Sequence, residues 1–276
     1  MKFLDARLGS AFKRSRSSLQ VLHLRLLQSS YGEHAIPFGY WLIVRSLIKL
    51  ISQSPDPLSP PYGLLQSRGK SLQVPELQEL LWKDELGTWA LDNGTIELLW
   101  KKIQWDRPKT VIECGVGVST LILARYATSC YSKSTNSYGI FSLEQDAQIK
   151  QEVERRLAKH GLGDSVRIIH SPISEQGRYE LDANKLSEQL GSNKADWLLI
   201  DGPAGPEGCR EWTLPLLARF CKSGARWFLD DAFRDAELRI LGRWLRQPGI
   251  IVEGIYPVGK GLATGTVNNP QEVTLL

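Results

Sequence analysis

Closely spaced cysteines are absent from this sequence. Its four cysteines are Cys114, Cys130, Cys209 and Cys221, and no two of them form a Cys-x-x-Cys pair. A zinc knuckle is therefore not predicted. Cysteines this far apart are typical of a reduced, cytoplasmic protein rather than of a disulfide framework.

A membrane-spanning hydrophobic run is also lacking. The most apolar stretch, residues 36–51, is about 16 residues long, short of the roughly 20 that a transmembrane helix needs. Pro37 suits the first turn of a helix, and Arg45 and Lys49 fall on one of its faces. Three roles stay open for this helix: packing on its own domain, packing in a homodimer, or lying on an anionic membrane surface.

A net positive excess is absent outside the first 30 residues. The net charge is +4, and residues 1–30 contain six basic residues against Asp5 alone, which leaves +5 there and −1 elsewhere. Because these basic residues are few and not interleaved with aromatics, nucleic acid is not an expected partner. The cluster Lys13-Arg-Ser-Arg16 occupies the place where a signal peptide would be apolar. We therefore expect a cytoplasmic protein and leave peripheral membrane contact through the N-terminus open.

Proline marks the clearest boundary in the chain. Four prolines fall within residues 54–61, which cannot form a helix or a central strand. We predict three parts: a basic, helical extension with a proline-rich linker (1–62), a helical cap (63–107) in which Asp92 caps a helix, and an α/β domain (108–276).

A strand, a glycine turn and a helix open the α/β domain. Residues 110–112 are β-rich, Gly115 and Gly117 permit a tight turn, and helical spacing begins at Val118. Such a unit presents free backbone N–H groups to a ligand. The third glycine of a dinucleotide fingerprint would fall at Thr120, and its absence argues against NAD or FAD. An ordinary strand-to-helix turn remains the alternative.

The segment Glu113-Cys-Gly-Val-Gly-Val-Ser119 resembles the first motif of class I S-adenosylmethionine-dependent methyltransferases, acidic-x-Gly-x-Gly. The resemblance implies that Gly115, Gly117 and Ser119 adjoin the methionine part of the cofactor. It also implies that Glu113 helps to hold the amino group of the cofactor.

Two further strand ends match this resemblance. Glu144 ends a strand where the family clamps the ribose hydroxyls, although an ordinary strand-end charge is the alternative. Ser171 begins the loop that contacts adenine in the family. The preceding His170 is a candidate general base, or a histidine that is merely packed or hydrogen-bonded.

Three carboxylates follow two later strands. Asp201 ends the buried run 195–200, and Asp230 and Asp231 end the run 224–229. Adjacent parallel strands deliver such residues to one edge of the sheet, where α/β folds bind ligands. Clustered carboxylates need a cation or a shared proton, and hard oxygen ligands suit Mg²⁺ or Ca²⁺. Helix capping by these aspartates is the alternative.

These aspartates look like the metal ligands of catechol-type O-methyltransferases, which have Asp after the fourth strand and Asp-Asn after the fifth. Asp231 in place of Asn departs from that pattern and puts metal dependence in question. Asp201 is expected to border the cofactor and to act either as a metal ligand or as a base. The segment 200–205, Ile-Asp-Gly-Pro-Ala-Gly, is similar to methyltransferases that act on glucuronic acid units of polysaccharide.

The resemblance implies a doubly wound, seven-stranded Rossmann-like sheet with strand order 3-2-1-4-5-7-6 and an N-terminal helical extension. The expected reaction is methyl transfer from S-adenosylmethionine to a hydroxyl of a small-molecule or carbohydrate acceptor, with Mg²⁺ or another divalent cation as a further expected cofactor. An aminopropyltransferase on the same fold and a membrane-recruited scaffold are the alternatives.

Overall fold

The computed structural model describes residues 34–52, 72–81, 91–130 and 139–275. The predictions for the basic segment 1–30 and the proline-rich segment 54–61 concern residues outside these ranges. The division at residues 62 and 107 stays a prediction.

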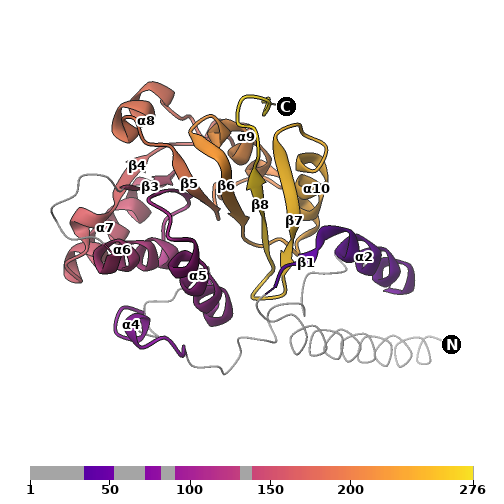
Figure 1. Ribbon diagram of the computed structural model, residues 1–276, viewed down its shortest axis with the longest axis horizontal. Coiled ribbons are helices and arrows are strands. Elements are labelled where there is room, and N and C mark those ends of the chain that lie inside the picture. Colours follow the sequence, from indigo (N-terminus) through magenta and orange to yellow (C-terminus); the bar gives the residue numbers. More distant parts are fainter. Residues whose placement is uncertain (1–33, 53–71, 82–90, 131–138, 276) are drawn as a thin grey trace, which may run out of the picture.

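One eight-stranded sheet runs through the molecule in the order β1-β7-β8-β6-β5-β2-β3-β4 (Figure 1). The five strands from β4 to β6 are parallel, and β8, β7 and β1 are each antiparallel to their neighbours. Seven strands follow the predicted order, so the predicted fold class is confirmed, and β1 is an eighth strand that the sequence did not indicate. The strands are β1 (Ile36–Pro37), β2 (Thr110–Cys114), β3 (Gly139–Glu144), β4 (Arg167–His170), β5 (Ala195–Ile200), β6 (Cys221–Leu229), β7 (Ile250–Tyr256) and β8 (Leu262–Val267).

Helices cover both faces of the sheet, because alternate residues of each strand point to opposite sides. In β2, Ile112 belongs to the hydrophobic core beneath α2, α8, α9 and α10, and Val111 belongs to the core beneath α4 to α7. The helices are α2 (Phe38–Ser52), α4 (Pro75–Gln78), α5 (Asn93–Asp106), α6 (Val118–Cys130), α7 (Ala147–Lys159), α8 (Ala183–Leu190), α9 (Thr213–Ala218) and α10 (Asp235–Trp244), with short 3-10 turns η1 (Gly163–Ser165) and η2 (Cys209–Trp212).

Short polar caps fix where several helices begin. The Asp92 carboxylate accepts hydrogen bonds from the N–H groups of Gly94 and Thr95, as predicted for the start of α5. Asp146 caps α7 in the same way. Asp182 caps α8, and the chain before it turns back on itself in an antiparallel bridge between Ile173 and Tyr179.

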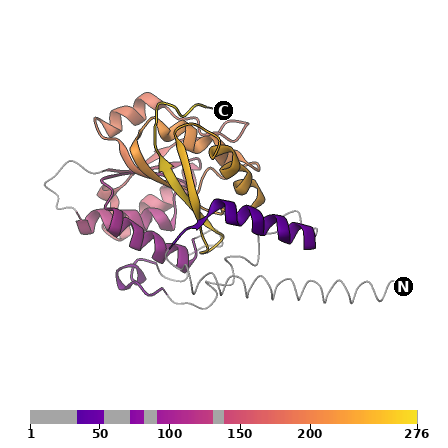
Figure 2. The same ribbon diagram turned by 45° about the vertical axis from the view of Figure 1, so that its right-hand side comes forward.

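Helix α2 packs against β7 near its start, and its far end runs outward from the sheet (Figure 2). Trp41 is fully buried 4.7 Å from the Phe233 ring, and its Nε1 donates to the Ile255 carbonyl at 3.3 Å. Arg45 pairs with Asp235. Packing on its own domain is therefore observed, and the homodimer and membrane roles stay predictions. Pro37 is in β1 rather than in the first helical turn, which corrects that prediction.

None of the helices within the described ranges is both long and apolar enough to cross a membrane.

Candidate active site

The loops after β2 and β5 meet backbone to backbone at the carboxyl edge of the sheet. Gly115 has φ +84°, and a Cβ there would lie 3.1 Å from the carbonyl carbon of Asp201 and the nitrogen of Gly202. A Cβ at Gly202 would approach the Gly115 nitrogen at 2.8 Å and collide with the Tyr179 hydroxyl. Both positions therefore require glycine. The glycine of the Asp201-Gly202-Pro203 sequence is thus needed for the contact between the two loops.

Gly117 lies on the open side of the same turn. A Cβ added there would meet nothing within 4 Å among the described atoms. The turn is held from both ends: the N–H of Val116 donates to Glu144 Oε2 at 3.0 Å, and the N–H of Gly117 donates to Thr120 Oγ1 at 2.9 Å. The turn is therefore preformed and leaves open space beside Gly117.

Glu113 lies inside β2, one residue before its end, and is completely buried under this turn. Its Oε2 accepts hydrogen bonds from Thr120 Oγ1 at 2.8 Å and Ser142 Oγ at 2.6 Å. Its Oε1 is buried and makes no hydrogen bond within the described residues. Burial raises the pKa of Glu113 to about 7, although the hydroxyls of Ser119, Ser142 and Thr120 oppose the rise. Ser119 itself is buried in the first turn of α6.

Glu144 ends β3 next to the turn, as predicted. Oε1 of this buried carboxylate accepts the N–H of Asp146 at 2.8 Å, while Oε2 holds Val116. Ser171 is also buried there, and its N–H donates to the Glu144 carbonyl at 2.8 Å.

His170 is at the exposed end of the edge strand β4. Its Nε2 is 3.1 Å from the Gln145 carbonyl oxygen. Two strands, β2 and β3, separate β4 from β5, so the structure does not bring His170 to Asp201. Its position matches the hydrogen-bonded alternative and does not support a role as general base.

The three predicted aspartates converge. Ligand oxygens of Asp201, Asp230 and Asp231 all lie within 4.8 Å of one another. Asp230 and Asp231 follow β6, and Asp231 has φ +60°. The backbone supports this arrangement, because the Asp201 N–H donates to the Cys114 carbonyl and the Asp230 N–H to the Ile200 carbonyl.

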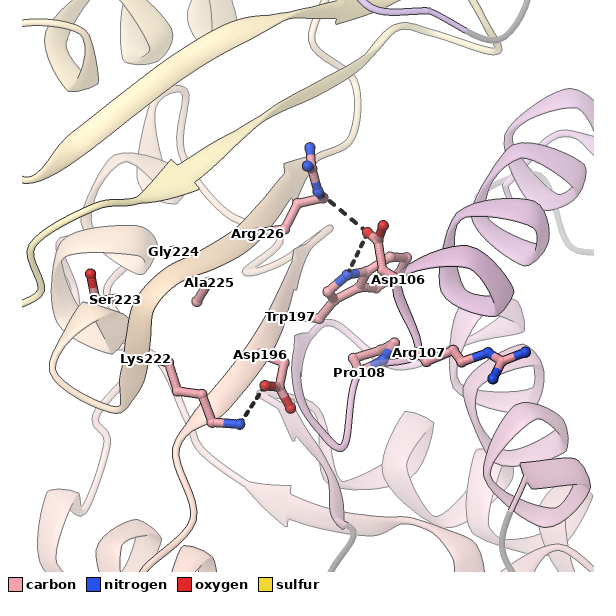
Figure 3. A pocket seen from close by; sticks show the side chains of 10 residues that line it. All are labelled: Asp106, Arg107, Pro108, Asp196, Trp197, Lys222, Ser223, Gly224, Ala225 and Arg226. Atoms are coloured by element: carbon pink, nitrogen blue, oxygen red, sulfur yellow. Dashed lines mark hydrogen bonds and ion pairs between the residues drawn. The ribbon is translucent and has the colours of Figure 1, made fainter.

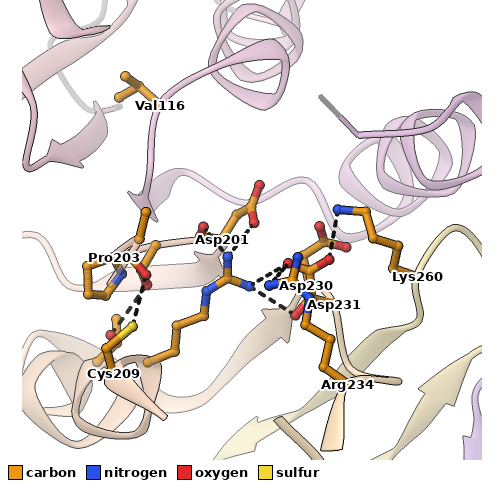
Figure 4. A network of polar contacts seen from close by, with 12 residues as sticks. Val116, Asp201, Pro203, Cys209, Asp230, Asp231, Arg234 and Lys260 are labelled. Carbon is orange, nitrogen blue, oxygen red and sulfur yellow. Dashed lines mark hydrogen bonds and ion pairs between the residues drawn. The ribbon is translucent and has the colours of Figure 1, made fainter. Parts of the chain in front are cut away.

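Three cations surround these carboxylates (Figure 4). Arg210 of η2 reaches both aspartate loops, with Nη2 3.1 Å from Asp201 Oδ1 and Nη1 3.1 Å from Asp231 Oδ2. Arg234 Nη1 and Lys260 Nζ also contact Asp231, at 2.9 and 2.8 Å. Three basic side chains thus balance three acidic ones.

The surroundings give each aspartate a different proton affinity. Burial raises the pKa of Asp201 to about 6 against the lowering effect of Arg210. Burial and the two neighbouring carboxylates hold the pKa of Asp230 well above its ordinary value. Asp231 is also buried, yet Arg210, Lys260 and Arg234 hold its pKa below its usual value. Asp231 is therefore the member held most firmly in the charged form.

This environment does not fit a divalent ion. The oxygen set suits Mg²⁺ in number and chemistry, but one oxygen each of Asp201 and Asp231 already faces the guanidinium of Arg210. A dication there would also lie beside three positive side chains.

Comparisons with known proteins agree with the topology. No family model and no curated protein matches the sequence. Among solved structures, an O-methyltransferase from Bacillus cereus in complex with SAH is 15% identical, with TM-score 0.55 over 75% of this chain and 98% of that one. The SAH-bound methyltransferase PaMTH1 from Podospora anserina is 15% identical, with TM-score 0.53 over 74% and 92%. A putative O-methyltransferase from Klebsiella pneumoniae is 18% identical, with TM-score 0.52 over 75% and 94%.

The chain has the fold of class I S-adenosylmethionine-dependent methyltransferases.

Within this methyltransferase fold, sequence reasoning missed three residues beside the predicted site. Arg210 comes from a segment with no recognisable pattern, and Lys260 lies in a Gly-Lys-Gly turn without the spacing of a phosphate-binding loop. Tyr179 lies in a polar segment, yet its ring is buried and its hydroxyl has no hydrogen-bond partner among the described residues. A lone aromatic residue in a polar stretch was the available signal for Tyr179.

A separate pocket of the methyltransferase fold lies at the opposite, amino end of the strands (Figure 3). It is crossed by the ion pairs Lys222–Asp196 and Arg226–Asp106. The Asp196 carboxylate also accepts the N–H groups of Lys109 and Thr110, which ties β5 to the start of β2. The polar groups of this pocket join strands to one another and to the end of α5. Ligands of open α/β sheets bind at the other edge.

Proposed function

We propose that this chain transfers a methyl group from S-adenosylmethionine to a hydroxyl oxygen of a small-molecule or carbohydrate acceptor. The observation that carries the proposal is the preformed Gly115–Gly117 turn at the carboxyl edge of a methyltransferase sheet, tied to Glu144 and open beside Gly117. The similar structures from Bacillus cereus and Podospora anserina contain SAH.

The residues around the turn fit the cofactor. Glu113 Oε1 and the Tyr179 hydroxyl are buried polar atoms without hydrogen bonds in the described part of the chain, and such atoms are costly unless a ligand pairs with them. In this proposal Glu113 receives the amino group, Gly115, Gly117 and Ser119 shape the methionine side, and Glu144 and Ser171 border the nucleoside side. When bound, the cofactor supplies the activated methyl group.

Asp201 is the residue best placed to act on the acceptor. Its side chain is 24% exposed, against 2% for Asp231, and its loop touches the glycine turn. A carboxylate with a pKa of about 6 is charged at neutral pH and can accept the proton of an acceptor hydroxyl. Arg210 fixes one Asp201 oxygen, Oδ1. The protein therefore contributes alignment and a base.

The balance of charge argues against the aminopropyltransferase alternative. A polyamine needs an acidic pocket, whereas Arg210, Arg234 and Lys260 offset the three aspartates here. The scaffold alternative depends on the basic N-terminus, which lies outside the described residues.

Calorimetric titration with S-adenosylmethionine tests the proposal. Gly117→Val fills the open space and should abolish binding. Glu144→Ala should weaken binding by about one to two orders of magnitude, since a hydrogen bond to a charged group contributes roughly 1.5–3 kcal/mol. Gly242→Val is the matched control, because a Cβ on that α10 glycine also meets nothing within 4 Å but lies outside the site.

If the wild type does not bind S-adenosylmethionine, the proposal fails. If it binds, a screen of phenols, sugars and uronic acids, with mass spectrometry of the products, identifies the acceptor. Product formed only with the decarboxylated cofactor would establish aminopropyl transfer instead.

A further inference from the structure

Arg210 is the most enclosed cation of the site. It is 8% exposed, and its guanidinium contacts both strand-end loops. Besides the two carboxylates, Nη2 donates to the Asp201 carbonyl at 2.8 Å and Nη1 to the Asp230 carbonyl at 3.3 Å. A planar guanidinium can hold several oxygens at once in fixed directions. The geometry of the cluster is therefore organised around one buried side chain.

A divalent ion and this guanidinium would compete for the same oxygens. Mg²⁺ and Ca²⁺ require ligand oxygens at about 2.0–2.6 Å, and Asp201 Oδ1 and Asp231 Oδ2 are already hydrogen-bonded to Arg210. The ion would also be repelled by Arg234 and Lys260. Glu237 is a fourth buried acid near Arg210, and burial raises its pKa, which favours its neutral form.

We propose that Arg210 occupies the place of a divalent ion between Asp201 and Asp231, so that the site works without a metal. Arg210 is then a positioning residue: it orients Asp201 toward the acceptor and neutralises Asp231. This interpretation replaces the metal-ligand role predicted for Asp201, Asp230 and Asp231. The inference concerns the same site as the proposed function. Only its activity assay with EDTA rests on that function.

The test is titration of the full-length protein with Mn²⁺, followed by electron paramagnetic resonance, which needs no cofactor or acceptor. The wild type should bind Mn²⁺ at the cluster only weakly. Arg210→Met removes the guanidinium charge while keeping a long apolar side chain, and it should bind Mn²⁺ on the order of tenfold or more tightly than the wild type. Adding Asp230→Asn to Arg210→Met should reverse the gain, which localises it.

Lys260→Met is the matched control, because it removes a cation from Asp231 but leaves Arg210 between the carboxylates. It should gain less Mn²⁺ affinity than Arg210→Met. Circular dichroism establishes that each variant is folded. If Arg210→Met does not fold, Arg210→Lys replaces it; this variant keeps the charge and should still exclude Mn²⁺.

Stoichiometric Mn²⁺ binding by the wild type that Asp230→Asn removes would overturn the inference. A folded Arg210→Met variant that gains no Mn²⁺ affinity would overturn the role of Arg210. In activity assays, EDTA should leave wild-type turnover unchanged, and turnover that EDTA abolishes and Mg²⁺ restores would contradict the inference. None of the Mn²⁺ results depends on the S-adenosylmethionine titration, so failure of the inference and failure of the proposed function are distinguishable.

Discussion

Glu113 combines complete burial with hydrogen bonds from two hydroxyls, so its protonation is coupled to the stability of the fold. Its pKa is raised to about 7 in the native state, above its ordinary value of 4.5. A carboxyl group with a raised native pKa stabilises the fold below its unfolded pKa and loses that contribution as the pH rises through the native pKa.

The pH dependence of stability is therefore a prediction for Glu113→Gln. Between about pH 4.5 and 7, the wild type should lose up to ~3 kcal/mol of unfolding free energy through this group, at about 1.4 kcal/mol per pKa unit. Glu113→Gln cannot ionise and should lack this part of the decline. Urea denaturation of both proteins at pH 5, 6 and 7 measures the difference. Parallel stability curves would contradict the prediction.

For Asp201, the prediction concerns the pH dependence of the reaction rate. The rate of methyl transfer should rise with pH through about 6, where Asp201 loses its proton and can act as a base. Asp201→Asn should remove this limb of the pH–rate profile and slow turnover by roughly 10²–10⁴-fold, while S-adenosylmethionine affinity changes little. A variant that keeps both the limb and the rate would rule out Asp201 as the base.

At the residue scale, the sequence showed the carboxylates but not their partners. Glu144, Asp201 and Asp230 each end an apolar run, and a pattern of that kind predicts a side chain at the sheet edge. Arg210 and Lys260 come from a 3-10 turn and a hairpin turn, and only the folded chain brings them to Asp231. Contacts between segments this far apart leave no local periodicity to detect.

At the scale of elements, α2 ties the N-terminal part of the chain to the site. Trp41 is buried against Phe233, which lies two residues after Asp231. The helix therefore packs against the segment after β6 that carries Asp230 and Asp231. Its apolar run predicted a helix, whereas β1 has only two residues and pairs with a strand more than 200 positions away. No local pattern could have predicted that strand.

The packing of α2 is tested by Trp41→Ala. Removing this fully buried ring should cost about 3–5 kcal/mol of unfolding free energy, because it leaves a cavity beside the buried Phe233. Ile43→Ala on the same helix is the control; that side chain is 62% exposed and should change stability by no more than about 0.5 kcal/mol. Equal losses in the two variants, measured by chemical denaturation, would show that α2 does not pack as described.

For the whole molecule, the strand order was available from the sequence only through the family resemblance. The individual strands could be located from apolar runs and turn residues, but their order in space depends on crossovers that composition does not encode. The strand-end motifs occurred in the order of the methyltransferase fold, and the sheet has that order.

Deleting residues 1–33 is expected to leave S-adenosylmethionine affinity unchanged. The residues proposed to contact the cofactor lie between 113 and 179, and the deletion keeps β1 and α2. It removes the basic excess of the chain, so association with anionic vesicles, if the full chain shows it, should be lost. Calorimetry and vesicle co-sedimentation measure the two effects. Loss of cofactor affinity in a folded deletion variant would assign this segment to the active site.

The pairing of β1 with β7 has a consequence for self-association. Ile36 and Pro37 lie against Ile255 and Gly254, and the Gly254 backbone approaches Ile36 so closely that a Cβ would not fit. These two residues thus occupy backbone groups that would otherwise be free to add a strand from another molecule. A truncation that continues past Pro37 should therefore expose the unpaired edge of β7 and cause aggregation, whereas a truncation that ends at residue 33 should not. Light scattering of the two truncated proteins measures this difference.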